Sequence, residues 1–378
     1  MGLDLLGDTI RQPMECRVQV GAGGAEISDL YPFLTELRAE VSRTEAAVAT
    51  LIFETRRDEQ GEWLVQDAGV LFPWQPIIIS TTSGEEVMRG YIRQVNTDYP
   101  ENAAAAKVTV ECQDDSLRLD REHKRVAWGT NAPTSDTVIL STILTPYGLT
   151  PHPDNGQGES QVVDPQNETD VRYLKRRAET NDYELIFSEG QVYFGPMRLS
   201  SATQPTILVY AGASSNCLSF NAKADAHQPD SVAFDIPAAS GNTSTEQIVQ
   251  PTLQWLGPTH ADSAASGLED FKWKMSGQAG ADQARLQALA QQKANDFDIH
   301  KIQAEGELDG MLYGHVLRAG LPVSVDGVGS WLGGTYYVDK VSHHFTFGGY
   351  RQRFTLLRNA YGDNLGSGSG SMLLQGVF

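Results

Sequence analysis

The carboxylates Glu111, Asp114 and Asp115 are the residues whose type and spacing come closest to a catalytic site. Glycoside hydrolysis needs two carboxyl groups that face each other across a cleft, about 5–9 Å apart. These three residues instead follow one another at the end of an expected strand, where the chain has to turn. The sequence therefore favours a structural role in the turn over a catalytic pair.

Two further patterns fall short of a metal or cofactor site. His343 and His344 are adjacent in an expected strand, so their side chains should point to opposite faces of the sheet and cannot easily share one metal ion. Gly327-x-Gly329 lacks the third glycine of a dinucleotide-binding loop because position 332 is Leu, and the sequence has neither a P-loop nor GxSxG. We predict no enzyme activity and no catalytic, cofactor-binding or metal-binding residues.

The basic run 175–177 (Lys-Arg-Arg) could in principle bind nucleic acid. A phosphate-binding surface needs many cations, whereas acidic residues flank this run in a chain of net charge −19 and pI about 4.8. Val171, Leu174 and Ala178 repeat at helical spacing. The pattern predicts a helix that ends near Asn181 and turns its basic side chains toward water.

Composition limits the class of protein. A chain of 378 residues and 41.3 kDa can form two or three domains. Its acidity argues against an anionic membrane or nucleic acid as a partner. The N-terminus has no secretory signal pattern, and no stretch approaches the run of about 18 apolar residues that spans a membrane. We expect Cys16, Cys112 and Cys217 to be buried free thiols in a protein made in a reducing cytoplasm.

Most of the sequence reads as strands. Short runs rich in Val, Ile, Thr, Tyr and Phe are separated by Gly, Asn and Asp, which is typical of a mainly β (α+β) protein. Helices are expected near 135–145, 170–181 and 282–297. The expected strands cover residues 15–20, 47–55, 76–80, 91–95, 107–112, 183–187, 191–194, 206–210, 231–236 and 336–347.

The sequence contains an internal duplication. Residues 76–115 align without a gap on residues 322–361, at an offset of 322 − 76 = 246. A fainter match pairs 37–54 with 218–235, at an offset of 218 − 37 = 181. The coinciding pairs at the first offset include Pro76 with Pro322, Tyr91 with Tyr337, Val95 with Val341, Thr109 with Thr355, and Val108 and Val110 with Phe354 and Leu356.

The two offsets differ by 246 − 181 = 65 residues, which implies an insertion in the second copy between about 236 and 305. We therefore expect two copies of one small β-barrel, an α/β module between them and a helical insertion in the second. The expected boundaries are 1–118 for the first barrel, 119–204 for the α/β module, 205–236 with 306–361 for the second barrel, 237–305 for the helical insertion, and 362–378 for a Gly/Ser tether with an apolar C-terminal tail.

Four phrases, in order along nearly the whole chain, resemble one known family. They are VTVECQDDSLRLDR (108–121), SDTVILSTILTPYGL (135–149), the helix and hairpin that end in YFGP (173–196), and YYVDKVSHHFTFGGYRQRFTLLRNA (336–360). With the duplication, they resemble the baseplate hub proteins of contractile tails: the phage late-control D family, the myophage tail hub and the hub part of type VI (VgrG-like) spike proteins.

The resemblance implies a homotrimer whose six tail-tube-like barrels surround a channel and join a sixfold inner tube to a threefold spike. It implies a separate spike protein, the inner tail-tube protein and other baseplate proteins as partners. Assembly would take place in the bacterial cytoplasm, and the final place would be the baseplate of a virion or injection particle. We expect no cofactor, membrane anchor or sequence-specific nucleic-acid contact. The alternative is a hydrolytic, cell-wall-degrading tail component.

The end of the sequence suggests a contact with a partner. Residues 366–370 alternate Gly and Ser, which is typical of a flexible tether. Apolar side chains follow and are a liability in water unless they dock. Type VI spike proteins continue into a needle at this point, so the resemblance implies a separate spike that such a tail could hold. The candidate partner-binding residues are Met372, Leu373, Leu374, Val377 and Phe378.

Overall fold

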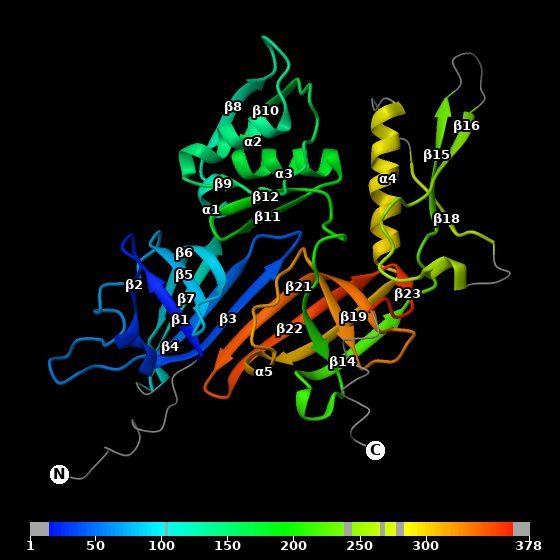
Figure 1. The fold of residues 1–378 in the computed structure, drawn as a ribbon. Helices are drawn as coiled ribbons and strands as arrows, with labels where there is room; N and C mark the ends of the chain where they lie inside the picture. Colours follow the sequence, from blue (N-terminus) through cyan, green and yellow to red (C-terminus); the bar gives the residue numbers. More distant parts are fainter. Residues whose placement is uncertain (1–14, 103–104, 238–243, 265–268, 277–282, 366–378) are drawn as a thin grey trace.

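The computed structural model describes residues 15–102, 105–237, 244–264, 269–276 and 283–365. Figure 1 shows two curled sheets side by side, with an α/β module and a long helix beside a small sheet standing on the same side of them. The mainly β fold class predicted from the sequence is confirmed. Among the described residues, no helix has the length and apolar character needed to cross a membrane.

The first barrel contains seven strands in the spatial order β3-β4-β7-β6-β5-β1-β2. Alternate side chains point inward, as the two-residue period of a strand requires. In β4, for example, Ala49, Leu51 and Phe53 are buried while their neighbours are not. The strands are β1 (Cys16–Val20), β2 (Ala25–Glu26), β3 (Leu34–Ser42), β4 (Val48–Glu54), β5 (Pro76–Thr81), β6 (Glu86–Asp98) and β7 (Lys107–Asp114).

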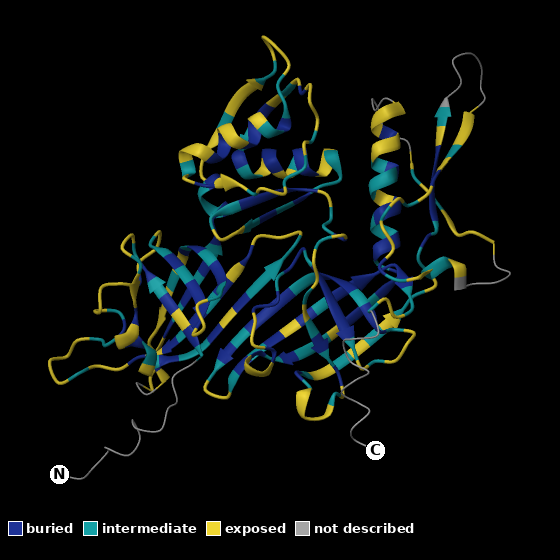
Figure 2. Ribbon diagram, viewed as in Figure 1, coloured by how far each residue is buried: buried dark blue, intermediate teal, exposed yellow. Residues whose placement is uncertain are grey.

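The second barrel has the corresponding order β14-β19-β22-β21-β20-β13, except that β13 pairs parallel with β20 whereas β1 pairs antiparallel with β5. Figure 2 shows buried residues along the strands of both barrels. The short helix α5 (Gly310–Tyr313) follows β19. The strands are β13 (Gln204–Leu208), β14 (Cys217–Ala224), β19 (Ile302–Asp309), β20 (Pro322–Asp326), β21 (Gly334–Thr346) and β22 (Gly349–Arg358).

Backbone details confirm the duplication at the offset of 246. Trp74 and Gly320 occupy equivalent positions and both have positive φ, at 71° and 74°. The Trp74 N–H donates to the carbonyl of Ile92 (2.7 Å), and the Gly320 N–H donates to that of Val338 (2.8 Å). A bulge then follows Ile92 in β6 and Val338 in β21. Such irregularities are specific local features, so their recurrence identifies β6 and β21 as equivalent strands.

The gapless sequence match needs a correction in the next strand. Val95 pairs with Val110 in the first barrel, and Val341 pairs with Phe354 in the second. Val110 therefore corresponds to Phe354 rather than Leu356, at an offset of 354 − 110 = 244, because the second hairpin is two residues shorter. A shift of two residues leaves every side chain on the same face, so the alternation in the sequence could not reveal it.

The fainter sequence match is also corrected. A bulge after Leu34 in β3 recurs after Cys217 in β14, at an offset of 217 − 34 = 183 rather than 181. The neighbour of β14 is β19, so β19 corresponds to β4. Strand β15 (Ser231–Pro237), predicted to belong to the second barrel, pairs instead with β16 (Ser244–Val249) and β18 (Lys272–Lys274). The other domain boundaries remain predictions.

Between β14 and β19 the chain forms the small sheet β16-β15-β18 and the helix α4 (Gln283–Ile299). Leu286, Ala290 and Ala294 lie four residues apart along α4, and this stripe packs against Val232 and Phe234 of β15. Strand β17 (Thr259–His260) pairs with β23 (Ala360–Tyr361) at the end of the second barrel. The long helix expected here is confirmed.

The α/β module lies between β7 and β13 in the chain. Its helix α3 begins at Asp170 and ends at Asn181, as predicted, and the next residue, Asp182, has the left-handed conformation. Arg177 is an exception to the prediction that the basic run 175–177 turns its side chains toward water, because its side chain is buried against Asp136. The module contains α1 (Ser116–Leu119), β8 (His123–Trp128), α2 (Asp136–Leu144), β9 (Thr150–Pro151), β10 (Asp164–Thr169), α3 (Asp170–Asn181), β11 (Glu184–Ser188) and β12 (Gln191–Gly195).

Candidate functional site

The two barrels are joined through one continuous sheet. Strand β3 of the first pairs antiparallel with β21 of the second over seven residue pairs, from Ser42 with Lys340 to Glu36 with Thr346. Phe345 of β21 is fully buried in the core of the first barrel, where its ring lies 4.1 Å from that of Tyr350. Because apolar side chains of one barrel complete the core of the other, the pair forms a single packed unit.

The opposite face of this joint is polar. Two cross-strand contacts connect β21 to β3: an ion pair with 2.7 Å between Lys340 Nζ and Glu40, and a side-chain contact with 2.9 Å between His344 Nε2 and Glu36. On the second barrel, Arg353 and Glu307 lie 2.8 Å apart. Exposed pairs contribute only about 0–1 kcal/mol each, so they neutralise charge and help to align the strands rather than hold the barrels together.

A buried network ties both barrels to the α/β module. Arg43, just after β3, donates to Asp339 of β21 (2.6 Å) and lies 3.5 Å from Glu184 of β11. The Tyr337 hydroxyl donates to Glu184 (2.7 Å). Burial raises the pKa of Glu184, an effect that Arg43 and Tyr337 oppose. Nothing in the sequence pointed to this network, because its members lie on three separate elements.

A cleft of about 1750 Å³ lies above the joint. Helix α3 and strand β11 line one side, and helix α4 lines the other. Both charged and apolar side chains line it, including Lys175, Glu179 and Lys293 as well as Leu253 and Leu289. The cleft separates the α/β module from the insertion in the second barrel. Each of these two parts therefore has a side surface that faces the cleft.

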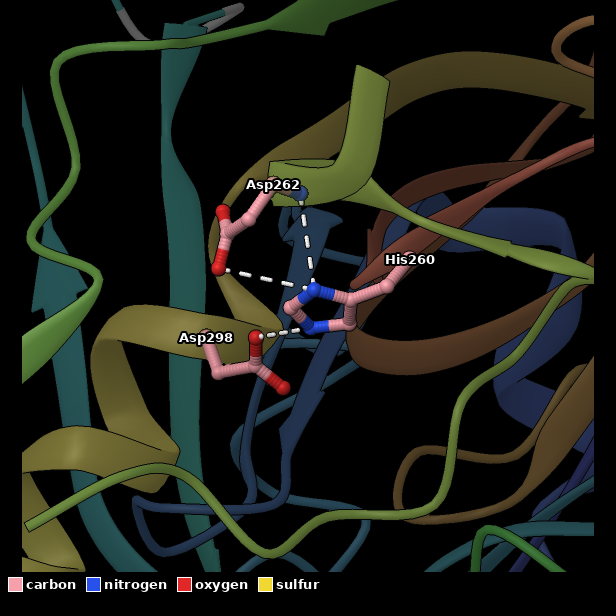
Figure 3. A group of neighbouring side chains, drawn as sticks. All are labelled: His260, Asp262 and Asp298. Carbon is pink, nitrogen blue, oxygen red and sulfur yellow. Dashed lines mark hydrogen bonds and ion pairs between the residues drawn. The ribbon is translucent and has the colours of Figure 1, made fainter. Parts of the chain in front are cut away.

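His260, Asp262 and Asp298 form the one three-residue group with metal-ligand geometry within the described ranges (Figure 3). His260 Nε2 lies 2.8 Å from Oδ1 of Asp298, and its Nδ1 lies 3.4 Å from Oδ2 of Asp262. The two ring nitrogens thus contact different carboxylates. No pattern in the sequence indicated this group, because Asp298 lies 298 − 262 = 36 residues after Asp262 and the three residues have no metal-binding spacing.

The surroundings of this group favour a structural role. Lys301 is 4% exposed, and its Nζ contacts both Asp262 and Asp230. The side-chain amide of Asn359 donates to Oδ2 of Asp298 (2.8 Å). The carboxylates are therefore already paired with a cation or a donor, as buried charges require. Because His260 lies in β17, beside β23, the cluster fastens the insertion to the second barrel.

The structural interpretation of the carboxylates at the end of β7 is confirmed for Asp114. Its oxygens accept the N–H of Ala47 (2.7 Å) and both the N–H (3.1 Å) and the hydroxyl (2.5 Å) of Ser116. Burial raises the pKa of Asp114 to about 6. Glu111 belongs to the opposite face of β7, so it cannot face Asp114 across a cleft.

The two adjacent histidines point to opposite faces, as predicted. His343 is buried and its Nδ1 lies 2.8 Å from the hydroxyl of Tyr350. His344 lies on the polar face against Glu36. They share no site.

The other residues singled out in the sequence are the three cysteines and the apolar C-terminal tail. Cys16 and Cys112 are buried free thiols, and burial raises the pKa of each to about 12. Cys217 is also free but only half-buried, which corrects the expectation for that residue. The candidate partner-binding tail, Met372, Leu373, Leu374, Val377 and Phe378, lies outside the described residues.

One known protein family matches most of the chain. A family model described as the Alg8 N-terminal domain matches residues 14–346. No curated protein sequence matches the chain.

Several solved structures share the fold at low sequence identity. A 43 kDa tail protein of prophage MuSo2 from Shewanella oneidensis aligns with a TM-score of 0.66 at 15% identity, covering 91% of this chain and 98% of its own. A tail protein from Neisseria meningitidis MC58 aligns with a TM-score of 0.62 at 13% identity, covering 92% and 97%. An E. coli protein described as a type VI secretion component similar to the T4 tail proteins gp27 and gp5 aligns with a TM-score of 0.50 at 12% identity, covering 87% and 75%. The fold is therefore that of phage tail proteins.

Proposed function

The chain belongs to the family of the Alg8 N-terminal domain, and from its tail-protein fold we propose that it is the structural hub of a contractile tail or injection-system baseplate. In this role three copies form a ring that joins a sixfold inner tube to a threefold spike. Its proposed functional analogues, by resemblance, are the late-control D and VgrG-like hubs. The particle that holds it is a virion or an injection device.

One observation carries the proposal. Two barrels of the same strand order are joined within one chain through a continuous sheet. Three such chains present six similar barrels, so one ring can match a sixfold tube on one side and a threefold spike on the other. Closed rings of identical chains are the common form of soluble assemblies, and a duplicated subunit is a direct way to connect two different symmetries.

Light scattering on the purified chain tests the trimer. Three chains of 41.3 kDa give about 124 kDa. A mass that stays at one chain, with or without the tube protein, would exclude the hub role. Electron microscopy of trimers should show six densities around a central opening.

The proposed partners are a separate spike protein, the inner tail-tube protein and other baseplate proteins. The apolar tail (Met372, Leu373, Leu374, Val377 and Phe378) is proposed as the contact with the spike, on the basis of its sequence alone. Truncation after Asn364 should leave the trimer intact but weaken co-purification with the spike. Unchanged co-purification would remove the tail from the interface.

The alternative, a hydrolytic tail component, has no specific observation in its favour. The related solved structures reported above are described as tail or secretion components. Purified trimer should release no soluble fragments from bacterial cell walls under conditions in which a lysozyme does. Release that disappears in a Glu111→Gln variant would instead support the hydrolytic role.

A further inference from the structure

We propose that β14 of one chain pairs with residues 94–98 of β6 in a second copy of the chain, in the antiparallel register that joins β3 to β21 within each chain. The pairing surface follows from the two barrels alone. Only the statement that the series closes after three chains rests on the proposed function.

The first step is the equivalence of the strands. The bulges place β6 on β21 at an offset of 246 and β3 on β14 at an offset of 183. The observed joint uses β3 from the first barrel and β21 from the second. Two equivalent strands take no part in this joint. They are β14 of the second barrel, which corresponds to β3, and the end of β6 of the first barrel, which corresponds to β21.

Both counterparts have an open edge. Within the described residues, β14 has β19 as its strand neighbour, and residues 94–98 of β6 have β7. Strand β5 covers the other side of β6 only as far as Tyr91. Unpaired edges of this kind are templates for another strand.

Side-chain exposure indicates that something covers these edges. Leu37 and Ala39 of β3 are fully buried by the joint, whereas their counterparts Phe220 and Ala222 of β14 are only partly buried. The same contrast appears on the other strand. Val341 and Phe345 are fully buried, whereas Val95 is half-buried and Tyr99 is 52% exposed. The positions that form a shared core within the chain are thus left incomplete at its two ends.

The observed joint predicts the register between chains. Ser42 pairs with Lys340, and subtracting or adding the offsets (340 − 246 = 94, 42 + 183 = 225) places Gln94 opposite Asp225. The next pairs on the polar face are Asn96 with Lys223 and Asp98 with Asn221. None of these pairs opposes like charges, which would disfavour the strand pair.

The observed joint also predicts which residue pairs between the two chains exchange backbone hydrogen bonds. The Arg43 N–H donates to the Asp339 carbonyl in the observed joint, so residues 41 and 39 form hydrogen-bonded pairs with 341 and 343. By equivalence, Val95 and Thr97 form hydrogen-bonded pairs with Ala224 and Ala222 of the second copy. Asn96 and Lys223 then form a non-hydrogen-bonded pair, in which opposed side chains lie closest.

Such a contact is head-to-tail, because it joins different surfaces of the two chains. It leaves β14 free on one end and β6 free on the other, so each added chain offers the same surfaces again. A head-to-tail series either closes into a ring or grows without limit. With the intrachain joint repeated at every contact, three chains close as six barrels.

Cysteine cross-linking tests the register. The double variant Asn96→Cys, Lys223→Cys should form disulfides between chains on mild oxidation and run as a covalent trimer on a denaturing gel without reductant. Asn96→Cys with Ser219→Cys, four residues out of register, should cross-link at least tenfold less. Glu40→Cys with Ser342→Cys, the corresponding pair of the intrachain joint, should form a disulfide without any change in mass.

A proline variant tests the hydrogen bonds. Thr97→Pro removes an N–H that points to the second copy and not to β7, so it should abolish the trimer and leave a folded single chain. Thr97→Ala should keep the trimer. The circular dichroism spectrum of each variant reports whether the chain itself is folded.

The outcomes separate the two proposals. A trimer by light scattering that neither cross-links through 96 and 223 nor responds to Thr97→Pro overturns the pairing and leaves the hub role standing. A chain that stays single at all concentrations overturns both. Cross-linked chains that grow beyond three support the pairing and refute closure at three.

Discussion

Replacement of Phe345 by Ala tests whether the two barrels fold as one unit. The side chain comes from β21 of the second barrel but is fully buried in the core of the first, stacked 4.1 Å from Tyr350. Truncation of a buried phenylalanine costs about 3–5 kcal/mol, because the transfer energy is lost and a cavity remains. With a denaturant slope of about 3 kcal/mol per M urea, the midpoint should fall by roughly 1–1.7 M.

The assay is urea unfolding followed by tryptophan fluorescence, with hydrogen exchange resolved to peptides of each barrel. The free energy of unfolding should fall by the same amount in both barrels, because the cavity lies in a core that both complete. Leu312→Ala is the matched control, since Leu312 is 64% exposed and its loss should cost less than about 0.5 kcal/mol. If Phe345→Ala destabilises one barrel while the other unfolds unchanged, the shared core is refuted.

Three further perturbations have defined outcomes. Burial, with a smaller effect of Arg318, lowers the pKa of His343 to about 3. The unfolded residue takes up a proton below about pH 6.5, so the stability is complete above that pH and falls by up to about 1.4 kcal/mol per pH unit toward pH 3. His343→Gln should flatten this slope in urea unfolding, and an unchanged slope would contradict the assignment. A Cβ on Gly90 would lie 2.0 Å from a carbonyl of β7; Gly90→Ala should therefore lower the unfolding free energy by at least about 1–3 kcal/mol, whereas Gly23→Ala, with open space around it, should leave it unchanged. Arg177→Met leaves the buried carboxylate of Asp136 without its cation and should cost about 3–5 kcal/mol, measured as a lower thermal midpoint; a loss below about 1 kcal/mol would contradict the buried pairing.

Local patterns determined a large part of the fold. The two-residue alternation marked strands such as β4 and β7, and the helical spacing of Leu174 and Ala178 marked α3. The duplication at 246 was visible because equivalent strands bury equivalent side chains. These features depend on neighbours in the chain or on a repeated pattern, so a single sequence contains them.

Only part of the candidate site could be predicted from the sequence. The turn role of Asp114 and the opposite faces of His343 and His344 follow from strand geometry and could be predicted. The pairing of Arg43 with Glu184 and of His260 with Asp298 could not, because each joins elements far apart in the chain.

Only the tertiary structure decided which strands are neighbours. It moved β15 out of the second barrel, shifted the match of Val110 by two residues to Phe354, and joined β3 to β21. Alternation repeats every two residues, so it determines the face on which a side chain lies. It does not change when the register shifts by an even number of residues, and it does not indicate which strand is the partner. Partner choice is settled by loop length, bulges and the packing of both cores, and these are properties of the folded chain.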